Sequence, residues 1–373
     1  MDPDEECDDG NDVDRDACTN TCVLRSSILV DVQLDSEGPG CLTSAAAYPS
    51  GDLVVAGFVV LPDRERDPWV GRVTASGELS WSRSWTGTDA IDSALVEAIA
   101  VDAVGNAYAL ARLKLESFGA YLYKFDEEGM LQWDVAVSAE PGASNSPEDL
   151  ITTAEGTTTV LTGHFGEPDG ARLMRFDTDG APAWPQAIDA GGVRHAAMEV
   201  HHAPADDLTL ISVIGTATDY RPRIERRAAD GTIVWTRTPT PPMGFPGVAI
   251  AAVAPDGSVS VVSTDYFDRE LLVVRSWSAQ GDGPQTGVPG YDQSLSLEEA
   301  VYGPDGDLYV IGNGSDENGR RGWLLRIDPR GEMVWGRRHE GRVNALVVTD
   351  TGDIVVAGCR DDDEALWLRR YEG

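Results

Sequence analysis

The clearest pattern along the chain is a short apolar run, rich in β-branched residues, that follows a turn residue and returns at a nearly constant interval. The seven turn residues are Gly51, Gly105, Gly156, Asp206, Gly257, Gly306 and Gly352. Successive intervals are 54, 51, 50, 51, 49 and 46 residues. So narrow a spread indicates a sevenfold internal repeat.

A second series of glycines lies half a repeat later, 24 to 26 residues after each of the first six residues of the first series. These are Gly77, Gly129, Gly180, Gly231, Gly281 and Gly331. Two hairpin turns in each repeat predict four short strands. Four strands in about 50 residues form one blade of a β-propeller, and the repeats resemble kelch-type blades in length. We find no long helical period, so the sequence predicts an all-β fold, a seven-bladed β-propeller of four-stranded blades.

Two kinds of side chain recur in register with the second glycines. Tryptophans follow four residues later, at Trp81, Trp133, Trp184, Trp235 and Trp335. Basic residues lie five residues before these glycines, at Arg72, Lys124, Arg175, Arg226 and Arg326. We expect the tryptophans to fill the wedge between blades near the rim and the basic residues to form ion pairs between blades.

The two ends of the repeat region predict how the ring closes. The chain stops at Gly373, before the seventh repeat reaches its fourth strand. Upstream of the first repeat, residues 28–34 (ILVDVQL) have the pattern of a strand, and no nearby segment of the sequence is expected to pair with it. Pairing this strand with the blade of residues 343–373 removes an exposed sheet edge. We therefore predict that residues 28–34 form the outer strand of the last blade.

Residues 1–25 differ from the rest, with nine acids, two bases and three cysteines, and we expect a separate module before a propeller of residues 26–373. This segment resembles the myxobacterial cysteine-rich repeat, whose Cys-Asp-Asp-Gly-Asn core precedes two further cysteines. The matching positions are Cys7, Asp8, Asp9, Gly10, Asn11, Cys18 and Cys22. The family's opening Cys-Gly-Asp-Gly turn is missing here. The resemblance implies a secreted or cell-surface protein.

The cysteines and the acids of the first segment predict two further features. Cys41 enters the first inner strand and Cys359 follows the second strand of the last blade, so both lie on the same face of neighbouring blades and are expected to form a disulfide. Hard oxygen ligands in the first segment suit Ca²⁺, and the alternative is a solvated acidic tether. The candidate calcium ligands are Asp8, Asp9, Asn11, Asp14 and Asp16.

The charge of the chain excludes some partners. Sixty-three acids against 29 bases give a net charge of −34, which repels nucleic acid and anionic lipid surfaces. The longest apolar stretch, residues 247–255, is too short to span a bilayer. The chain begins without an export signal, and we expect a monomer.

Another resemblance concerns the blades. Asp126, Asp177 and Asp328 stand three residues before a second-series glycine, with tryptophan four residues after it, as in the blade motif of quinone-type propellers. The resemblance implies blade packing. The adjacent cysteine pair of the quinone enzymes is missing, so no quinone is expected, and Ca²⁺ in the first segment is the one candidate cofactor.

The sequence contains few signs of a catalytic or metal-binding site. None of the five histidines has the spacing of a known metalloprotease or hydrolase. His201 and His202 are adjacent, so in a strand they point to opposite faces and we expect structural or surface roles. The longer connections between blades should share one face of the disc. Their candidate ligand-binding residues are Asp89, Asp92, Glu140, Arg194, His195, Phe245, Tyr291, Asp292 and His339.

Two functions fit this sequence. The first is a secreted or cell-surface binding protein that presents loops to a protein or glycan ligand. The second is an extracellular polysaccharide hydrolase or lyase with carboxylates lining the pore. Three carboxyl or histidine groups that converge at the pore mouth with shifted pKa values favour the enzyme.

Overall fold

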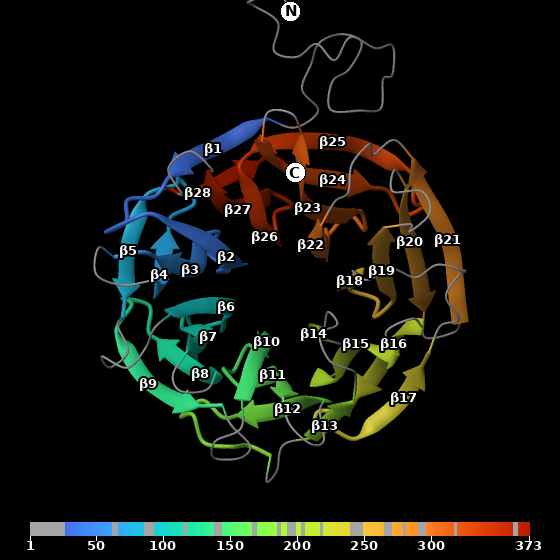
Figure 1. Cartoon of the computed structure of the whole chain (residues 1–373), viewed down its shortest axis with the longest axis horizontal. Coiled ribbons are helices and arrows are strands. Elements are labelled where there is room, and N and C mark those ends of the chain that lie inside the picture. The colour runs from blue at the N-terminus through green and yellow to red at the C-terminus, as the bar shows by residue number, and fades with distance from the viewer. Residues whose placement is uncertain are drawn as a thin grey trace, which may run out of the picture.

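The chain forms a ring of seven four-stranded antiparallel sheets around a central channel (Figure 1). The computed structural model describes residues 27–61, 66–85, 93–114, 118–137, 144–165, 170–184, 188–191, 199–202, 206–216, 219–238, 249–264, 271–278, 281–289, 296–316, 319–360 and 365–373. In these segments the regular elements are β-strands, and none of them holds a helix long and apolar enough to cross a membrane. The predicted all-β, seven-bladed propeller is confirmed.

The strands fall into four concentric sets. The inner strands are β2 (Gly40–Ala47), β6 (Ser93–Val101), β10 (Ser144–Thr152), β14 (Glu199–His202), β18 (Ala249–Val253), β22 (Ser296–Tyr302) and β26 (Arg342–Val348). The second strands are β3 (Leu53–Val59), β7 (Ala107–Lys114), β11 (Thr158–Phe165), β15 (Leu208–Thr216), β19 (Val259–Thr264), β23 (Leu308–Asp316) and β27 (Ile354–Arg360).

The remaining strands complete each blade toward the rim. The third strands are β4 (Asp67–Val73), β8 (Phe118–Phe125), β12 (Gly170–Phe176), β16 (Asp219–Arg227), β20 (Leu271–Ser278), β24 (Gly319–Ile327) and β28 (Ala365–Tyr371). The outer strands are β5 (Leu79–Ser84), β9 (Leu131–Ala136), β13 (Ile188–Gly191), β17 (Ile233–Arg237), β21 (Gly281–Pro289), β25 (Met333–Glu340) and, for the last blade, β1 (Ile28–Gln33).

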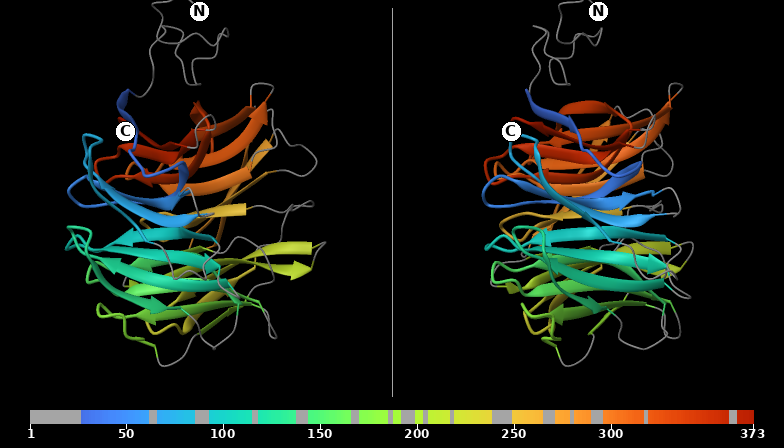
Figure 2. Two further views of the ribbon diagram at one scale, coloured as in Figure 1. Left: turned by 60° about the vertical axis from the view of Figure 1, so that its left-hand side comes forward. Right: turned by 90° about the vertical axis from the view of Figure 1, so that its left-hand side faces the viewer.

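The repeated turn residues form tight hairpin turns, as the sequence predicts. Gly51 and Gly77 have φ values of 85° and 92°, in the left-handed region that glycine enters without steric cost. In the fourth blade Asp206 takes the same place with φ 61°, a conformation that aspartate tolerates better than most residues. Both hairpin turns of a blade join strands at the same end, so they share one face of the disc, which Figure 2 shows from the side.

The hydrophobic core lies between neighbouring blades. Leu53 and Val55 of the first blade, for example, pack in one buried cluster with Val355 and Leu366 of the last blade. Because each sheet is covered on both faces by its neighbours, the ring is a closed series of sheet-on-sheet contacts.

The repeated tryptophans bind one blade to the next at the rim, as expected. The indole nitrogen of Trp81 donates to the carbonyl of Glu127 in the following blade at 2.9 Å, and that of Trp133 donates to Thr178 at 3.0 Å. A Cβ added at Gly129 would lie 2.5 Å from the Trp81 ring. The glycine therefore serves both its own turn and the tryptophan of the preceding blade.

The repeated basic residues also bridge blades, but mostly by a different bond from the one predicted. Arg72 forms an ion pair across the blades with Glu127 at 3.4 Å. Lys124 and Arg175 instead donate to backbone carbonyls of the next blade, at 3.0 and 2.6 Å. Arg326 pairs with two aspartates of its own blade. The prediction of ion pairs is thus only partly right, because the adjoining turn presents carbonyl oxygens at most of these positions.

Ring closure follows the prediction. Strand β1 pairs antiparallel with β28, so residues from the start of the chain complete the last sheet (Figure 1). Asp31 holds this strand by accepting hydrogen bonds from Trp367 at 2.7 Å and Arg369 at 2.6 Å. The Cys41–Cys359 disulfide is present, with its Cα atoms 4.7 Å apart.

Candidate functional site

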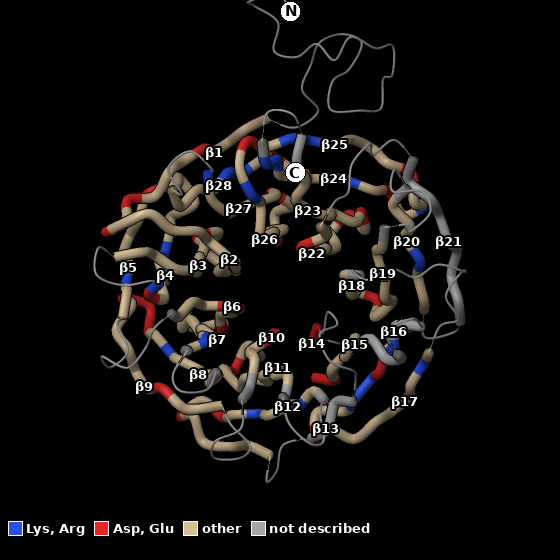
Figure 3. Tube along the Cα trace, in the orientation of Figure 1, with Lys and Arg blue, Asp and Glu red and all other residues tan. Residues whose placement is uncertain are grey.

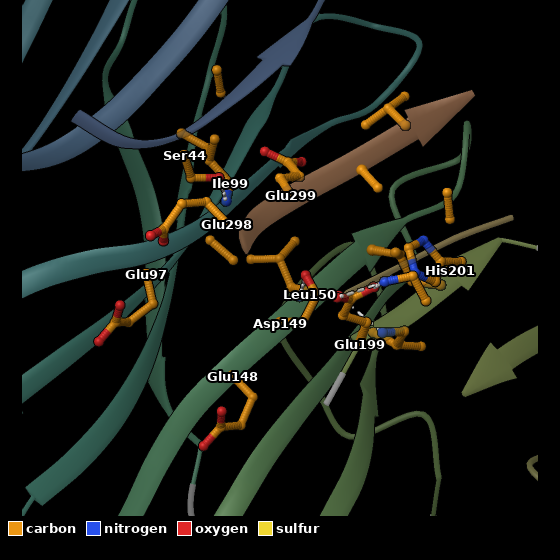
Figure 4. Close-up of a pocket in the computed structure, with 18 of the residues that line it drawn as sticks. Ser44, Glu97, Ile99, Glu148, Asp149, Leu150, Glu199, His201, Glu298 and Glu299 are labelled. Atoms are coloured by element: carbon orange, nitrogen blue, oxygen red, sulfur yellow. Dashed lines mark hydrogen bonds and ion pairs between the residues drawn. The ribbon is translucent and has the colours of Figure 1, made fainter. Parts of the chain in front are cut away.

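The central channel contains a cavity of about 370 Å³ to which all seven inner strands contribute. Small residues such as Ala98, Ala252 and Ala300 leave the space open. Figure 4 shows the polar side chains around it, among which carboxylates predominate. Ligand pockets in proteins span roughly 300 to 1,000 Å³, so the cavity has room for a small molecule.

The acidic side chains reach the cavity because five inner strands carry a β-bulge at the same place, eight residues before the turn glycine. The extra residue in each bulge is Thr43, Glu97, Glu148, Glu298 or Asn344. A bulge inserts one residue that pairs with nothing on the next strand, which bends the strand and redirects its side chains. The bulges therefore present two successive side chains to the channel rather than one.

A glycine on the second strand makes room for the bulge in several blades. A Cβ at Gly358 would collide with the carbonyl of Arg342, and one at Gly312 would lie 2.7 Å from the carbonyl of Ser296. These glycines permit a close approach of two backbones, which any side chain would prevent.

In four blades the side chain of the residue seven places before the turn residue joins neighbouring inner strands. Asp149 accepts a hydrogen bond from the amide of Val200 at 2.9 Å, Glu199 accepts from Ala251 at 3.1 Å, and Glu299 accepts from Leu346 at 2.7 Å. Ser44 accepts in the same way from the amide of Ile99 at 3.1 Å. In each case the donor lies six residues before the turn residue of the following blade. These four side chains thus have a structural role.

The three acids of these joints lie in a shared electrostatic environment with His201. Burial raises the pKa of Glu299 to about 8, and the charges of Asp149 and Glu199 add to the shift. Burial likewise raises the pKa of Asp149 to about 6. Burial opposes protonation of His201, but its 3.0 Å contact with Glu199 raises the pKa of the imidazole above its ordinary value.

The bulge carboxylates are the acids that no inter-blade joint uses. Glu97 forms an ion pair with Arg112 at 2.9 Å, and burial nevertheless raises the pKa of Glu97. Burial raises the pKa of Glu148 to about 7, and the nearby charge of Glu97 adds to that shift. Figure 4 shows Glu97, Glu148 and Glu298 on one side of the view, and the Glu199–His201 pair toward the other.

The cavity is lined by acidic rather than basic side chains. Six carboxylates line it, and no lysine or arginine is among the residues that do so within the described part of the chain: Glu97, Glu148, Asp149, Glu199, Glu298 and Glu299. Figure 3 shows acidic positions on the inner strands, whereas basic positions occupy mainly the strands farther out. The carboxylates are spread around the channel, and no cluster of three or more His, Cys, Asp or Glu side chains suited to a metal ion occurs in the segments described above.

Most residues that the sequence singled out as ligand-binding lie outside the described residues. This is true of the loop candidates Asp89, Asp92, Glu140, Arg194, His195, Phe245, Tyr291 and Asp292, and of the calcium candidates Asp8, Asp9, Asn11, Asp14 and Asp16. They stay predictions.

His339 lies elsewhere than expected. It belongs to strand β25 rather than to a connection between blades, and it is 1% exposed. Its ring packs between Trp367 and Tyr371 of the last blade. Burial, with the positive charges of Arg369 and Arg337, lowers its pKa to about 3. The expectation of a loop residue failed because β25 extends farther than the repeat spacing indicated.

The cavity carboxylates did not appear among the candidates from the sequence. Their signal was nevertheless present: acids recur eight or seven residues before the turn residue in four repeats, as Glu97, Glu148–Asp149, Glu199 and Glu298–Glu299. A search for acids at a fixed distance from the turn, rather than for long connections, would have found them.

No protein-family model matches this chain, and no curated protein matches it at a significant level. The resemblances to the myxobacterial cysteine-rich repeat and to kelch and quinone-type blades therefore stay predictions.

Solved structures similar to the chain share its architecture at low sequence identity. A catalytically inactive virginiamycin B lyase of Staphylococcus aureus, with quinupristin, is 9% identical, covers 91% of this chain and 98% of its own, and has a TM-score of 0.55. Sqt1 of Chaetomium thermophilum is 12% identical over 92% of this chain and 98% of its own, with a TM-score of 0.52. A protein of unknown function from Dyadobacter fermentans is 10% identical over 93% and 98%, with a TM-score of 0.50. At these identities the likeness establishes the propeller fold alone.

Proposed function

We propose that this protein is a secreted or cell-surface binding protein whose central cavity takes a small organic cation. The observation that carries the proposal is the set of six carboxylates around one cavity, without a lysine or arginine among the described lining residues. A disulfide is typical of proteins in oxidising compartments, which supports the location.

The distribution of the acids favours an organic cation with separated charges. A bare metal ion needs several ligands at one point, and the described carboxylates form no such group. A short linear polyamine places two or three ammonium groups several ångströms apart, so each can meet a different carboxylate. Burial raises the pKa values of Glu148 and Glu299, and repulsion from neighbouring acids adds to both shifts; a bound cation relieves this repulsion.

Thermal unfolding with a panel of probes tests the proposal. Spermidine and putrescine should raise the unfolding midpoint at 0.15 M salt, whereas glucose and N-acetylglucosamine should not. The variant Glu97→Gln/Glu148→Gln should bind spermidine at least about tenfold more weakly. Glu78→Gln/Glu155→Gln removes the same charge from two exposed turns and serves as the matched control. Equal spermidine affinity in all three proteins would contradict the proposal.

The second candidate function is polysaccharide cleavage, and one observation favours it. Glu148 has a pKa of about 7 beside the acid Glu97, which suits a general acid near a second carboxylate. Release of new reducing or unsaturated ends from an acidic or neutral polysaccharide, lost in Glu148→Gln, would establish this function in place of the first.

A further inference from the structure

The seam between the first and last blades carries a covalent bond on the channel side. Cys41 of β2 and Cys359 of β27 form the disulfide, although 318 residues separate them in the sequence. Both are buried, with 5% and 4% of their surface exposed. The bond therefore lies within the wall of the ring, next to the residues that line the cavity.

A relay of side-chain amides extends from this disulfide into the cavity wall. Asn344 donates to the carbonyl of Leu42 at 2.8 Å and to Sγ of Cys41 at 3.1 Å. Asn313 donates to the side-chain carbonyl of Asn344 at 3.3 Å and exchanges two hydrogen bonds of 2.9 Å with the backbone of Val343.

The far end of the relay is one of the cavity acids. Burial raises the pKa of Glu298, the side chain of Asn313 opposes this shift, and Glu298 lines the cavity together with Asn344. The disulfide, two asparagines and a cavity carboxylate thus form a continuous path over the first, seventh and sixth blades.

Other contacts hold the same seam without the disulfide. At the rim, β1 pairs with β28 over its whole length. At middle radius, Arg370 donates to the carbonyl of Gly51 at 3.1 Å and pairs with Asp353 at 2.7 Å. Loss of the disulfide should therefore leave the ring closed and affect mainly its inner wall.

We propose that the Cys41–Cys359 disulfide is a redox-sensitive support of the cavity wall, whose reduction loosens β2, β26 and the end of β23 while the ring stays closed. A dithiol supplies two electrons and two protons: the protein S–S bond breaks to give two thiols, and the dithiol becomes a disulfide. Without the covalent bond, the position of Asn344 between Leu42 and Asn313 depends on hydrogen bonds alone. This device goes beyond the proposed binding function and does not depend on it.

Hydrogen exchange measured by mass spectrometry tests this inference without any ligand. The oxidised protein is compared with protein reduced by excess dithiothreitol and with the variant Cys41→Ala/Cys359→Ala, so that failure of the variant to fold does not prevent the test. Amides of residues 40–47, 342–348 and 312–316 should exchange about tenfold faster, a difference of about 1.4 kcal/mol in local opening.

The distribution of faster exchange among the blades tests the inference. Exchange in β1, β28 and, across the channel, β10 should stay unchanged. The control Asp31→Asn weakens the rim contact instead and should accelerate exchange in β1 and β28 but not in β26. Unchanged exchange after reduction, or equal acceleration in every blade, would overturn the inference.

Discussion

In the channel, the hydrogen bond and the surroundings of Glu299 have opposite effects on the ionisation of its carboxyl group. Its carboxylate accepts a hydrogen bond from Leu346 in the next blade, yet it lies near the charges of Asp149 and Glu199. The hydrogen bond favours the ionised form, whereas burial and the neighbouring acids oppose it more strongly. The inter-blade joint is therefore made at an electrostatic cost that increases as the pH rises.

This conflict predicts how the stability of a Glu299→Gln variant depends on pH. The pKa of Glu299 in the folded protein, about 8, lies above its ordinary value of 4.5. Such a group stabilises the fold fully below pH 4.5, and this contribution is lost as the pH rises through 8. The glutamine keeps an oxygen acceptor for Leu346 and cannot ionise.

Urea unfolding should therefore give nearly equal stability for wild type and variant at pH 4, below the ordinary pKa of glutamate. At pH 9 the variant should be more stable by about 1 to 2 kcal/mol, a value reduced for partial solvent exposure. The control Glu78→Gln, an exposed turn residue, should show no such divergence. A variant less stable than wild type at pH 9 would show that the ionised carboxylate strengthens the joint.

Within single elements, the second hairpin turns of the second and third blades each combine two requirements in one glycine, Gly129 and Gly180. Gly129 has φ 74° and faces the Trp81 ring, whereas Gly105 has φ 97° and no atom of another residue within 3.5 Å of an added Cβ. Alanine at either position brings backbone strain of roughly 1 kcal/mol. Only alanine at Gly129 also displaces the tryptophan, at a further cost of about 1 to 3 kcal/mol.

The pair Gly129→Ala and Gly105→Ala separates these contributions. Chemical unfolding should place the Gly129 variant clearly below the Gly105 variant in stability, with a change in tryptophan fluorescence for the first alone. Equal losses of stability in both variants would mean that backbone strain accounts for the whole effect and that Trp81 moves without loss of stability.

The strands and turns followed from the sequence because they depend on local features. Glycine spacing, apolar runs and the tryptophans at fixed positions each indicate the structure of a short segment. Because the pattern recurs in seven repeats, it is not a chance match. The bulges at Glu97, Glu148 and Glu298 were not predicted, because a bulge is a mismatch in register between two strands that no single strand reveals. The cavity acids recur at a fixed distance before the turn residue in the sequence, but their position at the channel depends on these bulges in three blades.

At the scale of the whole molecule, closure depends on contacts that join the two ends of the chain. The disulfide and the pairing of β1 were predictable from topology, because blades one and seven must meet in a closed ring. The amide relay of Asn313 and Asn344 was not predictable, since its partners come from three blades. The burial of His339 likewise depends on Trp367 and Tyr371 of the neighbouring blade.

Truncation tests the contribution of the first strand to closure. Removal of residues 1–34 deletes β1, exposes the edge of β28 and uncovers apolar residues that pack with Val30 and Val32. We expect a loss of about 2 to 4 kcal/mol in unfolding free energy and a tendency to associate. Removal of residues 1–26 keeps β1 and should leave both properties unchanged, as urea unfolding and light scattering would show. Equal stability of the two truncated forms would mean that β1 is dispensable for closure.

Binding of an organic cation by the channel acids can be measured by calorimetric titration of spermidine at pH 7, in two buffers of different ionisation enthalpy. Because Glu148 and Glu299 have pKa values of about 7 and 8, a bound cation should lower these pKa values and release a fraction of a proton, and Glu148→Gln should reduce this release. Absence of binding heat, or binding without proton release in wild type, would contradict the account.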